Sequence, residues 1–325
     1  MESLSSVKLL FPSFSELRYN SYKKKQSMFK EKNVVIQLDT KTVYSFMDSL
    51  IPIKKYVQKA KDLGYSHLGM MDVDNLYGAY HFLEEAESAG LRPLLGLELS
   101  LIKAEQELHL RLLALDSQGY RNLMKVSTLK MMGQKNWENF QHLFKGLAVI
   151  VPAFDGVADL DLGLDFYVGV FPSTPKQEFG RPTLPLHTVR YFDRGDLETL
   201  QMLRAIRENA SLREIGSLPN HEFLLAPDAL AGAFKETFPE SLANLEKLVR
   251  DVHYDINREL KLPRFNRERP AVEELRERSE AGLKKRGLTG KLYQERLDQE
   301  LDVIHQMSFD DYFLIVWDLL RFGRS

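Results

Sequence analysis

Apolar residues follow two alternating patterns from residue 33 to about residue 260. Short runs rich in β-branched and other apolar residues predict strands, and several of the segments between them carry apolar residues at helical spacing. The predicted strands are 33–38, 67–72, 91–101, 107–115, 146–152, 166–172 and 183–189, and the predicted helices are 52–63, 76–90, 119–130 and 194–208. This order of strands and helices is typical of an α/β fold with a parallel sheet or barrel.

The first predicted helix has clear signals at both of its ends. Pro52 is suited to the first helical turn, where its missing N–H would have no partner in any case. Ile53, Val57 and Ala60 then form an apolar stripe, and Gly64 is suited to the left-handed conformation that ends a helix. We therefore expect one helix here, with a single apolar face packed on the sheet.

The pattern changes after a charged, proline-marked segment at 261–270. Beyond it only helical spacing remains. Two apolar faces can be followed, one through Tyr293, Leu297, Leu301 and Ile304 and the other through Phe309, Phe313, Val316, Trp317 and Leu320. We predict an N-terminal extension at 1–32, an α/β domain at 33–262 and a helical region at 263–325.

Composition excludes several classes of protein. The 325 residues are 44% hydrophobic and 28% charged, which is sufficient for a core and argues against global disorder. The chain has no cysteine, so a disulfide scaffold, a cysteine-ligated metal and a thiol nucleophile are excluded. The net charge of -2 is not that of a whole-domain nucleic-acid binder.

The same composition bears on where the protein is found. No apolar run is long enough to span a membrane. Residues 1–32 lack the apolar core of a signal peptide, and we expect this extension to be disordered. The absence of cysteine fits a reducing compartment, and we expect a cytoplasmic protein.

Polar side chains gather just after the predicted strands, where parallel α/β folds place their active sites. Carboxylates from several strand ends could bind a divalent metal, although two cations stand among them. The set comprises Asp39, Lys41, Asp48, Asp72, Glu98, His109, His187 and Arg190. Because Lys41 and Arg190 would repel a metal, these residues favour an ion-pair network and leave a working metal site open. No GxxxxGK[ST], GxGxxG or GxSxG motif is present.

Four segments, in order, resemble one protein family. Residues 44–61, 62–99 and 109–129 resemble the amino-terminal PHP (polymerase and histidinol phosphatase) domain of the bacterial DNA polymerase III alpha subunits, the family C replicative polymerases. Residues 309–322 resemble the helix that opens the palm of these enzymes. The likeness runs from about residue 33 to the end and is to the shorter, Gram-positive type. It implies a distorted seven-stranded α/β barrel.

The resemblance also implies a metal site whose ligands are mostly replaced. In family members with an intact site, His, Asp, Glu and Cys ligands hold a metal cluster that can support 3′–5′ exonuclease activity. The positions that depart from the ligand pattern are Asp39, Lys41, Val73, Ala153, Thr188 and Arg190, and those that keep a ligand-type residue are Asp48, Asp72, Glu98 and His109.

These replacements suggest a hypothesis of charge substitution. Val73 and Ala153 offer no lone pair to a metal, while Lys41 and Arg190 bring permanent positive charge. We expect the two cations to replace the metals as counterions to the acids at 39, 48, 72 and 98, with no metal bound. If any metal were held, its ligands would be Asp48, Asp72, Glu98 and His109.

The resemblance further implies the activity of the longer family proteins. These are DNA-directed DNA polymerases that extend primers with deoxynucleotides on primer–template DNA, use Mg²⁺, and meet the sliding clamp and other replisome proteins through other regions. Their Gly-Ser-rich segment and catalytic aspartates lie beyond Ser325, so we expect this chain alone to be inactive. Residues 263–325 are expected to begin the palm and thumb region, with the PHP domain as a structural platform.

Two alternatives remain open at the level of sequence. The chain could be a metal-dependent 3′–5′ exonuclease or phosphoesterase that uses the remaining ligand-type residues. It could instead be an interaction module for another replisome protein, with 19–26 and 233–248 as its contact segments.

Overall fold

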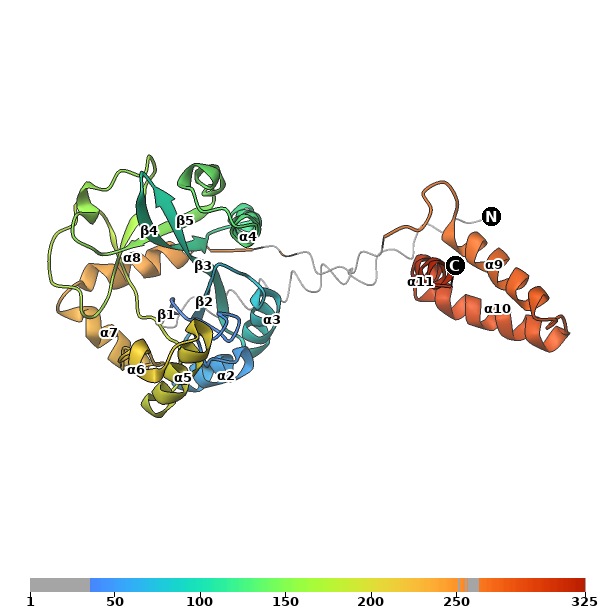
Figure 1. The fold of residues 1–325 in the computed structure, drawn as a ribbon, viewed down its shortest axis with the longest axis horizontal. Helices are drawn as coiled ribbons and strands as arrows, with labels where there is room; N and C mark the ends of the chain where they lie inside the picture. The colour runs from blue at the N-terminus through green and yellow to red at the C-terminus, as the bar shows by residue number, and fades with distance from the viewer. Residues whose placement is uncertain (1–35, 251, 255, 257–262, 325) are drawn as a thin grey trace, which may run out of the picture. The chain divides into compact units, whose positions relative to one another are not determined.

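The computed structural model describes residues 36–250, 252–254, 256 and 263–324, which fall into two compact units. The units lie within Met1–Asp255 and Ile256–Ser325 (Figure 1). The predicted extension at 1–32 lies outside the described residues. Each unit is described by itself.

The first unit is built on one curled sheet of seven strands. The strands are β1 (Ile36–Gln37), β2 (His67–Val73), β3 (Arg92–Lys103), β4 (Gln106–Ala114), β5 (Leu147–Pro152), β6 (Tyr167–Val170) and β7 (Thr183–Pro185). They lie in sequence order, and all neighbours are parallel except those on either side of β4, which pair antiparallel. An isolated bridge between Thr40 and Val189 joins the segments after β1 and β7. The sheet therefore curls far enough to bring its two edges together.

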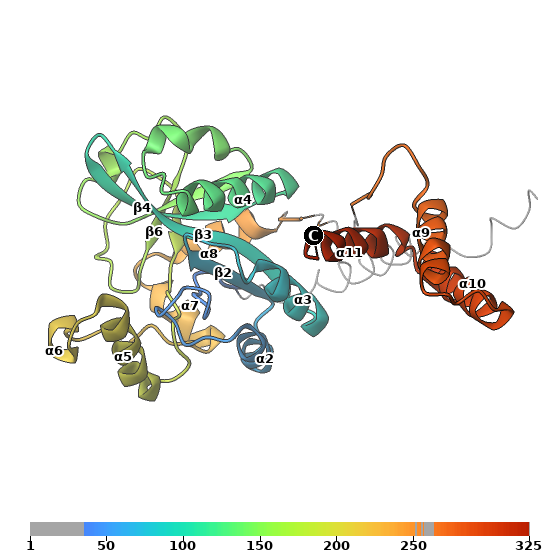
Figure 2. The same ribbon diagram turned by 45° about the vertical axis from the view of Figure 1, so that its right-hand side comes forward.

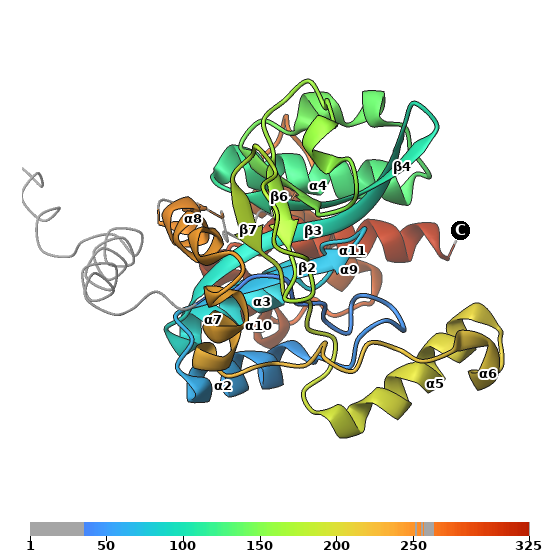
Figure 3. The ribbon, with the colours of Figure 1, turned by 90° about the vertical axis from the view of Figure 1, so that its left-hand side faces the viewer.

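Seven described α-helices accompany this sheet. They are α2 (Ile53–Leu63), α3 (Ala79–Ala89), α4 (Ser117–Met131), α5 (Leu197–Glu208), α6 (Leu212–Ile215), α7 (Pro227–Lys235) and α8 (Pro239–Val249). Helices α4 and α2 lie on different sides of the strands, and α5 and α6 extend away from them (Figures 2 and 3). The predicted α/β class and seven-stranded, PHP-like sheet are confirmed. No helix within the described ranges is long and apolar enough to cross a membrane.

The core forms between the concave sheet and the helices around it. Met71 and Ile150 of the sheet and Leu38, directly after β1, pack with Leu245 and Val249 of α8. Gly69 on β2 is required by close approach, because a Cβ atom there would lie 1.8 Å from the carbonyl oxygen of Leu38. Packing at this density fixes the strands, and therefore fixes the residues at their carboxyl ends.

Several predicted boundaries differ from the structure, and two of these differences have a clear local cause. Helix α3 begins at Ala79 rather than at residue 76, because the Asn75 side chain accepts a hydrogen bond from the Tyr77 N–H and makes a turn there. The predicted strand 183–189 ends at Pro185. The chain then leaves β6, and Val189 pairs with the segment after β1 instead.

The second unit contains three described helices: α9 (Ala271–Lys285), α10 (Lys291–Gln306) and α11 (Asp310–Phe322). Its small core is formed by Leu275, Leu301 and Leu314, one residue from each helix. The predicted apolar face of α11 is packed only in part. Phe313 and Leu320 are 43% and 54% exposed, the other three residues of that face are half-buried, and Leu314 beside it is buried. The α11 helix carries apolar residues on two sides, so spacing alone did not identify the packed side.

Candidate functional site

Ionisable side chains from β3, from β4 and from the segment after β1 meet near the end of β2. Asp39 follows β1 directly, and Glu98 on β3 is in register with Val73 at the end of β2. Arg111 on β4 lies directly opposite Glu98 in the antiparallel ladder. Sheet register alone therefore places these side chains together.

We call Asp39, Lys41, Glu98 and Arg111 the inner cluster. Lys41 is completely buried and forms ion pairs with Asp39 and with Glu98, the second at 2.7 Å between Nζ and Oε2. Arg111 contacts the same two carboxylates, with Nε 3.3 Å from Asp39 Oδ2 and Nη2 3.0 Å from Glu98 Oε2. Two carboxylates are thus matched by two cations.

Electrostatics in the inner cluster favour the ionised acids. Burial alone would raise the pKa of Asp39, but the adjacent Lys41 and Arg111 outweigh it and hold that pKa well below its usual range. Burial would also raise the pKa of Glu98, but the same two cations lower it. Thr188 donates a further hydrogen bond of 2.7 Å from its hydroxyl to Asp39 Oδ2. The surroundings of the inner cluster therefore favour the charged form of both acids.

A second group, the outer cluster, surrounds Asp48. Arg190 forms an ion pair with Asp48 and another with Glu222, at 3.2 Å from its Nε. From α5, Arg204 and Arg207 reach Asp48 Oδ1 at 2.8 Å and 3.2 Å. Two acids here face three arginines, and the Arg207 side chain is 36% exposed.

Asp72 is held differently from the other acids. Its carboxylate accepts hydrogen bonds from the Thr42 N–H at 2.5 Å, the Thr42 hydroxyl at 2.7 Å and the Ser45 hydroxyl at 2.7 Å. Among the ion pairs of the described residues, none involves Asp72. Burial raises the pKa of Asp72 despite these hydrogen bonds. A cationic partner was expected for Asp72 from the sequence, and hydroxyl groups take that place.

Other predicted site residues lie outside both clusters. His109 is on the same face of β4 as Arg111 but two residues nearer the hairpin, where it is exposed and bonded to Ser100 Oγ at 2.8 Å. Ala153 uses its N–H to bond the carbonyl of Gly169, and the Val73 N–H bonds Ser45 Oγ. His187 is buried and contacts the Phe223 carbonyl at 2.9 Å through Nε2.

Four charged residues of the clusters were missed from the sequence: Arg111, Arg204, Arg207 and Glu222. Arg111 could have been found, because it shares the face of His109 and sits deeper along an alternating strand. Arg204 and Arg207 resemble the solvent side of an amphipathic helix. Glu222 lies outside regular structure, so no period in the sequence marks it.

The geometry does not fit a metal ion. Across the described ranges, no group of three or more His, Cys, Asp or Glu side chains is placed to hold one. The space between Asp39 and Glu98 is occupied by the Lys41 ammonium group, which cannot act as a ligand while charged. No reaction step through a metal therefore follows from this arrangement.

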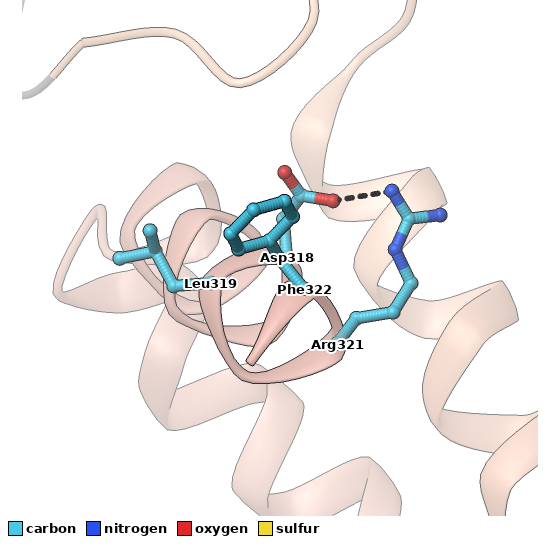
Figure 4. Close-up of a pocket in the computed structure, with 4 residues that line it drawn as sticks. All are labelled: Asp318, Leu319, Arg321 and Phe322. Carbon is cyan, nitrogen blue, oxygen red and sulfur yellow. Dashed lines mark hydrogen bonds and ion pairs between the residues drawn. The ribbon is translucent and has the colours of Figure 1, made fainter. Parts of the chain in front are cut away.

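The second unit has a hollow of its own on α11. It is lined by Asp318, Leu319, Arg321 and Phe322 (Figure 4). Asp318 and Arg321 are paired at 2.7 Å, and the other two lining side chains are apolar. The one carboxylate of this set is already paired with Arg321 and has no second acid or histidine beside it in the lining, so the clusters on the sheet remain the candidate site.

Comparison with protein families agrees with the fold. The model of the PHP domain matches residues 37–174, and the model of the bacterial DNA polymerase III alpha NTPase domain matches residues 273–325. The PHP match lies within the first unit, in agreement with its seven-stranded α/β sheet.

Two similar proteins are subunits of bacterial DNA polymerases. DNA polymerase III subunit alpha of Streptococcus pyogenes serotype M1 is 47% identical over 291 residues, covering 89% of this chain and 28% of the relative. The same subunit of Bacillus subtilis is 27% identical over 332 residues, covering 89% of this chain and 30% of the relative. The chain is homologous to the PHP region of the DNA polymerase III alpha subunit. It spans less than a third of the length of these relatives.

One solved structure, from Bifidobacterium adolescentis, is similar at 13% identity and a TM-score of 0.33, covering 55% of this chain and 85% of that one. At this score the likeness adds nothing to the assignment.

Proposed function

We propose that this chain is the PHP-containing region of a replicative DNA polymerase, in which the PHP domain is a structural platform without metal chemistry. The homology to DNA polymerase III alpha subunits supports the first part. The second part rests on the chemistry of the inner cluster, in which side-chain cations stand between the acids.

The main support for the proposal is a wholly buried lysine between the buried carboxylate of Asp39 and the half-buried carboxylate of Glu98. Burying an acid without a counterion costs several kcal/mol, so acids left by a lost metal need another cation. Lys41 and Arg111 supply it for Asp39 and Glu98, and Arg190 supplies it for Asp48. The fold is thereby kept while nothing remains to activate a water molecule.

The second unit is proposed to begin the palm and thumb region of the polymerase. The family match at residues 273–325 supports this assignment, and so do the exposed apolar side chains of the second unit. Three helices that bury one leucine each leave many apolar side chains exposed, for example Leu319 and Phe322 at 66% and 80%. Helices of this kind are stable when further protein covers them. In this assignment, 33–262 is the PHP domain.

The whole polymerase would bind primer–template DNA and deoxynucleotides and would use Mg²⁺ for phosphoryl transfer through residues outside this chain. The sliding clamp and other replisome proteins would be its partners, also through other regions. A role in chromosome replication places the protein in the cytoplasm.

Two assays on the same preparations test this proposal. The intact subunit should extend a primer with deoxynucleotides and Mg²⁺, while this chain alone should not. With Mn²⁺ and a 3′-ended primer, neither should show exonuclease activity attributable to the PHP domain. Exonuclease activity of this chain that is lost in Glu98→Gln would overturn the platform role and favour a metal-dependent nuclease.

A further inference from the structure

The outer cluster carries an excess of positive charge. Its two acids, Asp48 and Glu222, face three arginines, Arg190, Arg204 and Arg207. The inner cluster, in contrast, matches two acids with two cations. One positive charge of the outer cluster is thus left over at a position partly enclosed by protein, which is the electrostatic condition for attracting an anion.

The two arginines on α5 also have hydrogen-bond donors to spare. A guanidinium group carries five N–H donors. Among the described residues, Arg204 has one hydrogen-bond acceptor, Asp48 Oδ1, which its Nε reaches at 2.8 Å, so both of its Nη groups are unused. Arg207 contacts Asp48 through Nη1 and Glu208 through Nε, which leaves its Nη2 unused. These donors are available to a ligand.

The three guanidinium groups meet at a single point. Arg204 and Arg207 are three residues apart on α5, so they lie on the same side of the helix, and both reach the same oxygen of Asp48. Arg190 reaches the other oxygen of Asp48. Guanidinium groups that converge in this way suit the several oxygens of one phosphate group, each of which accepts hydrogen bonds.

Exposure of the arginines shows on which side the point is open. The side chains of Arg190, Arg204 and Arg207 are 10%, 17% and 36% exposed, so solvent access increases toward Arg207. On that side lies Glu208, whose side chain is 53% exposed. A nucleic acid backbone needs a row of cations and would be repelled by Glu208, whereas a single phosphate group needs only one such point.

We propose that the outer cluster binds the phosphate group of a small molecule, either free inorganic phosphate or a phosphate monoester. The unused Nη groups of Arg204 and Arg207 donate to the phosphate oxygens, and Arg190 adds positive charge from the buried side. Asp48 holds the arginines together and at the same time repels the ligand. Binding is therefore limited by Asp48, and no bond of the ligand is broken.

The test is isothermal titration calorimetry of the intact subunit with inorganic phosphate, at constant ionic strength with chloride as the reference anion. Arg204→Gln combined with Arg207→Gln should weaken phosphate binding about tenfold or more, because the charge-assisted donors are lost. Arg213→Gln is the matched control, since this exposed arginine on α6 has no ion-pair partner in the described part of the chain. It should leave the affinity unchanged.

Substitution of the acids should have the opposite sign. Asp48→Asn removes the nearest negative charge and should strengthen phosphate binding about tenfold. Because this variant alters a buried ion pair, Glu208→Gln provides a second measurement at an exposed side chain and should strengthen binding about twofold. Circular dichroism of each variant shows whether the fold is kept.

The source of the phosphate is distinguished by a second titration with a deoxynucleoside 5′-monophosphate. Tighter binding of the nucleotide would assign the site to a monoester, and equal or weaker binding would assign it to free phosphate. The inference is overturned if the unsubstituted subunit binds neither, if the arginine double variant binds as tightly as the unsubstituted subunit, or if both acid variants weaken binding. An effect of the arginines on binding of an oligonucleotide, without any on phosphate, would also overturn it.

Discussion

The inner and outer clusters neutralise acids of the same site by different physical routes. The inner cluster matches buried Asp39 and half-buried Glu98 with two cations, and its lysine has no contact with solvent. The outer cluster matches Asp48 and Glu222 with three arginines, of which Arg207 reaches solvent. The same charge change should therefore cost far more in the inner cluster, where neither water nor a spare cation can replace what is lost.

Removing the inner lysine should have the largest effect. Lys41→Met keeps the length of the side chain but leaves Asp39 and Glu98 with Arg111 alone. We expect a loss of about 3–5 kcal/mol in the free energy of unfolding, measured by urea denaturation. Adding Glu98→Gln to this variant should recover part of the loss, because one uncompensated charge is then removed.

A matched surface control is available on α2. Lys59 pairs with Asp193 at 3.2 Å, and both side chains are substantially exposed. Lys59→Met should change the free energy of unfolding by no more than about 1 kcal/mol. Similar losses in the Lys41 and Lys59 variants would contradict the special role of the buried cation.

Removing the arginine of the outer cluster should have an intermediate effect. In Arg190→Met, Asp48 keeps Arg204 and Arg207, while half-buried Glu222 loses the partner at 3.2 Å. We expect a loss of about 1–3 kcal/mol, which is the usual cost of one buried unpaired polar group. A loss as large as that of Lys41→Met would show that the two clusters do not differ as described.

Substitution of Asp72 should change the pH dependence of the free energy of unfolding more than it changes that free energy at neutral pH. Asp72→Asn keeps an acceptor for the Thr42 N–H and should cost about 1 kcal/mol at pH 7. Asp39 and Glu98 have lowered pKa values, so their contribution is present above about pH 4 and is lost as the pH falls further. The raised pKa of Asp72 acts oppositely and adds stability as the pH falls.

The Asn variant should therefore lose stability more steeply than the unsubstituted protein between pH 5 and pH 3, a window set by the ordinary carboxyl pKa values of about 4. Thermal unfolding followed by circular dichroism across this range is the measurement. Parallel curves for the two proteins would contradict the assignment of a raised pKa to Asp72.

The smallest effect is expected at the edge of the outer cluster. Arg207→Met removes a pair at 3.2 Å from a side chain that is 36% exposed. Solvent screening and the remaining arginines should limit the loss to about 0–1 kcal/mol, and added salt should reduce it further. A loss insensitive to salt would place Arg207 with the inner group instead.

The fold was largely predictable because it depends on local patterns. Strand and helix periods, Pro52 and Gly64 were sufficient to locate the main elements, and the seven-stranded α/β class followed. The spacing of apolar residues could not predict which side of α11 packs on the other helices, because Phe313 and Leu314 are adjacent and both apolar. That choice depends on partners distant in sequence.

The candidate site was predictable only in part, for the same reason. Asp39, Lys41 and Glu98 could be proposed together because strand ends converge, and the structure brings them within contact. Glu222 comes from an irregular segment, and the role of Asp72 depends on two hydroxyl groups of a loop whose shape no motif records. His109 carried a ligand-type side chain but lies beyond the cluster.

If side-chain cations occupy the place of metal in this site, the purified protein should hold no bound metal. The measurement is elemental analysis of protein purified without chelators, from cells grown with zinc, manganese and iron. Charge substitution predicts no metal at a stoichiometric level, and no gain on adding these ions before dialysis. One or more ions per chain that survive dialysis and are lost in Glu98→Gln would contradict it.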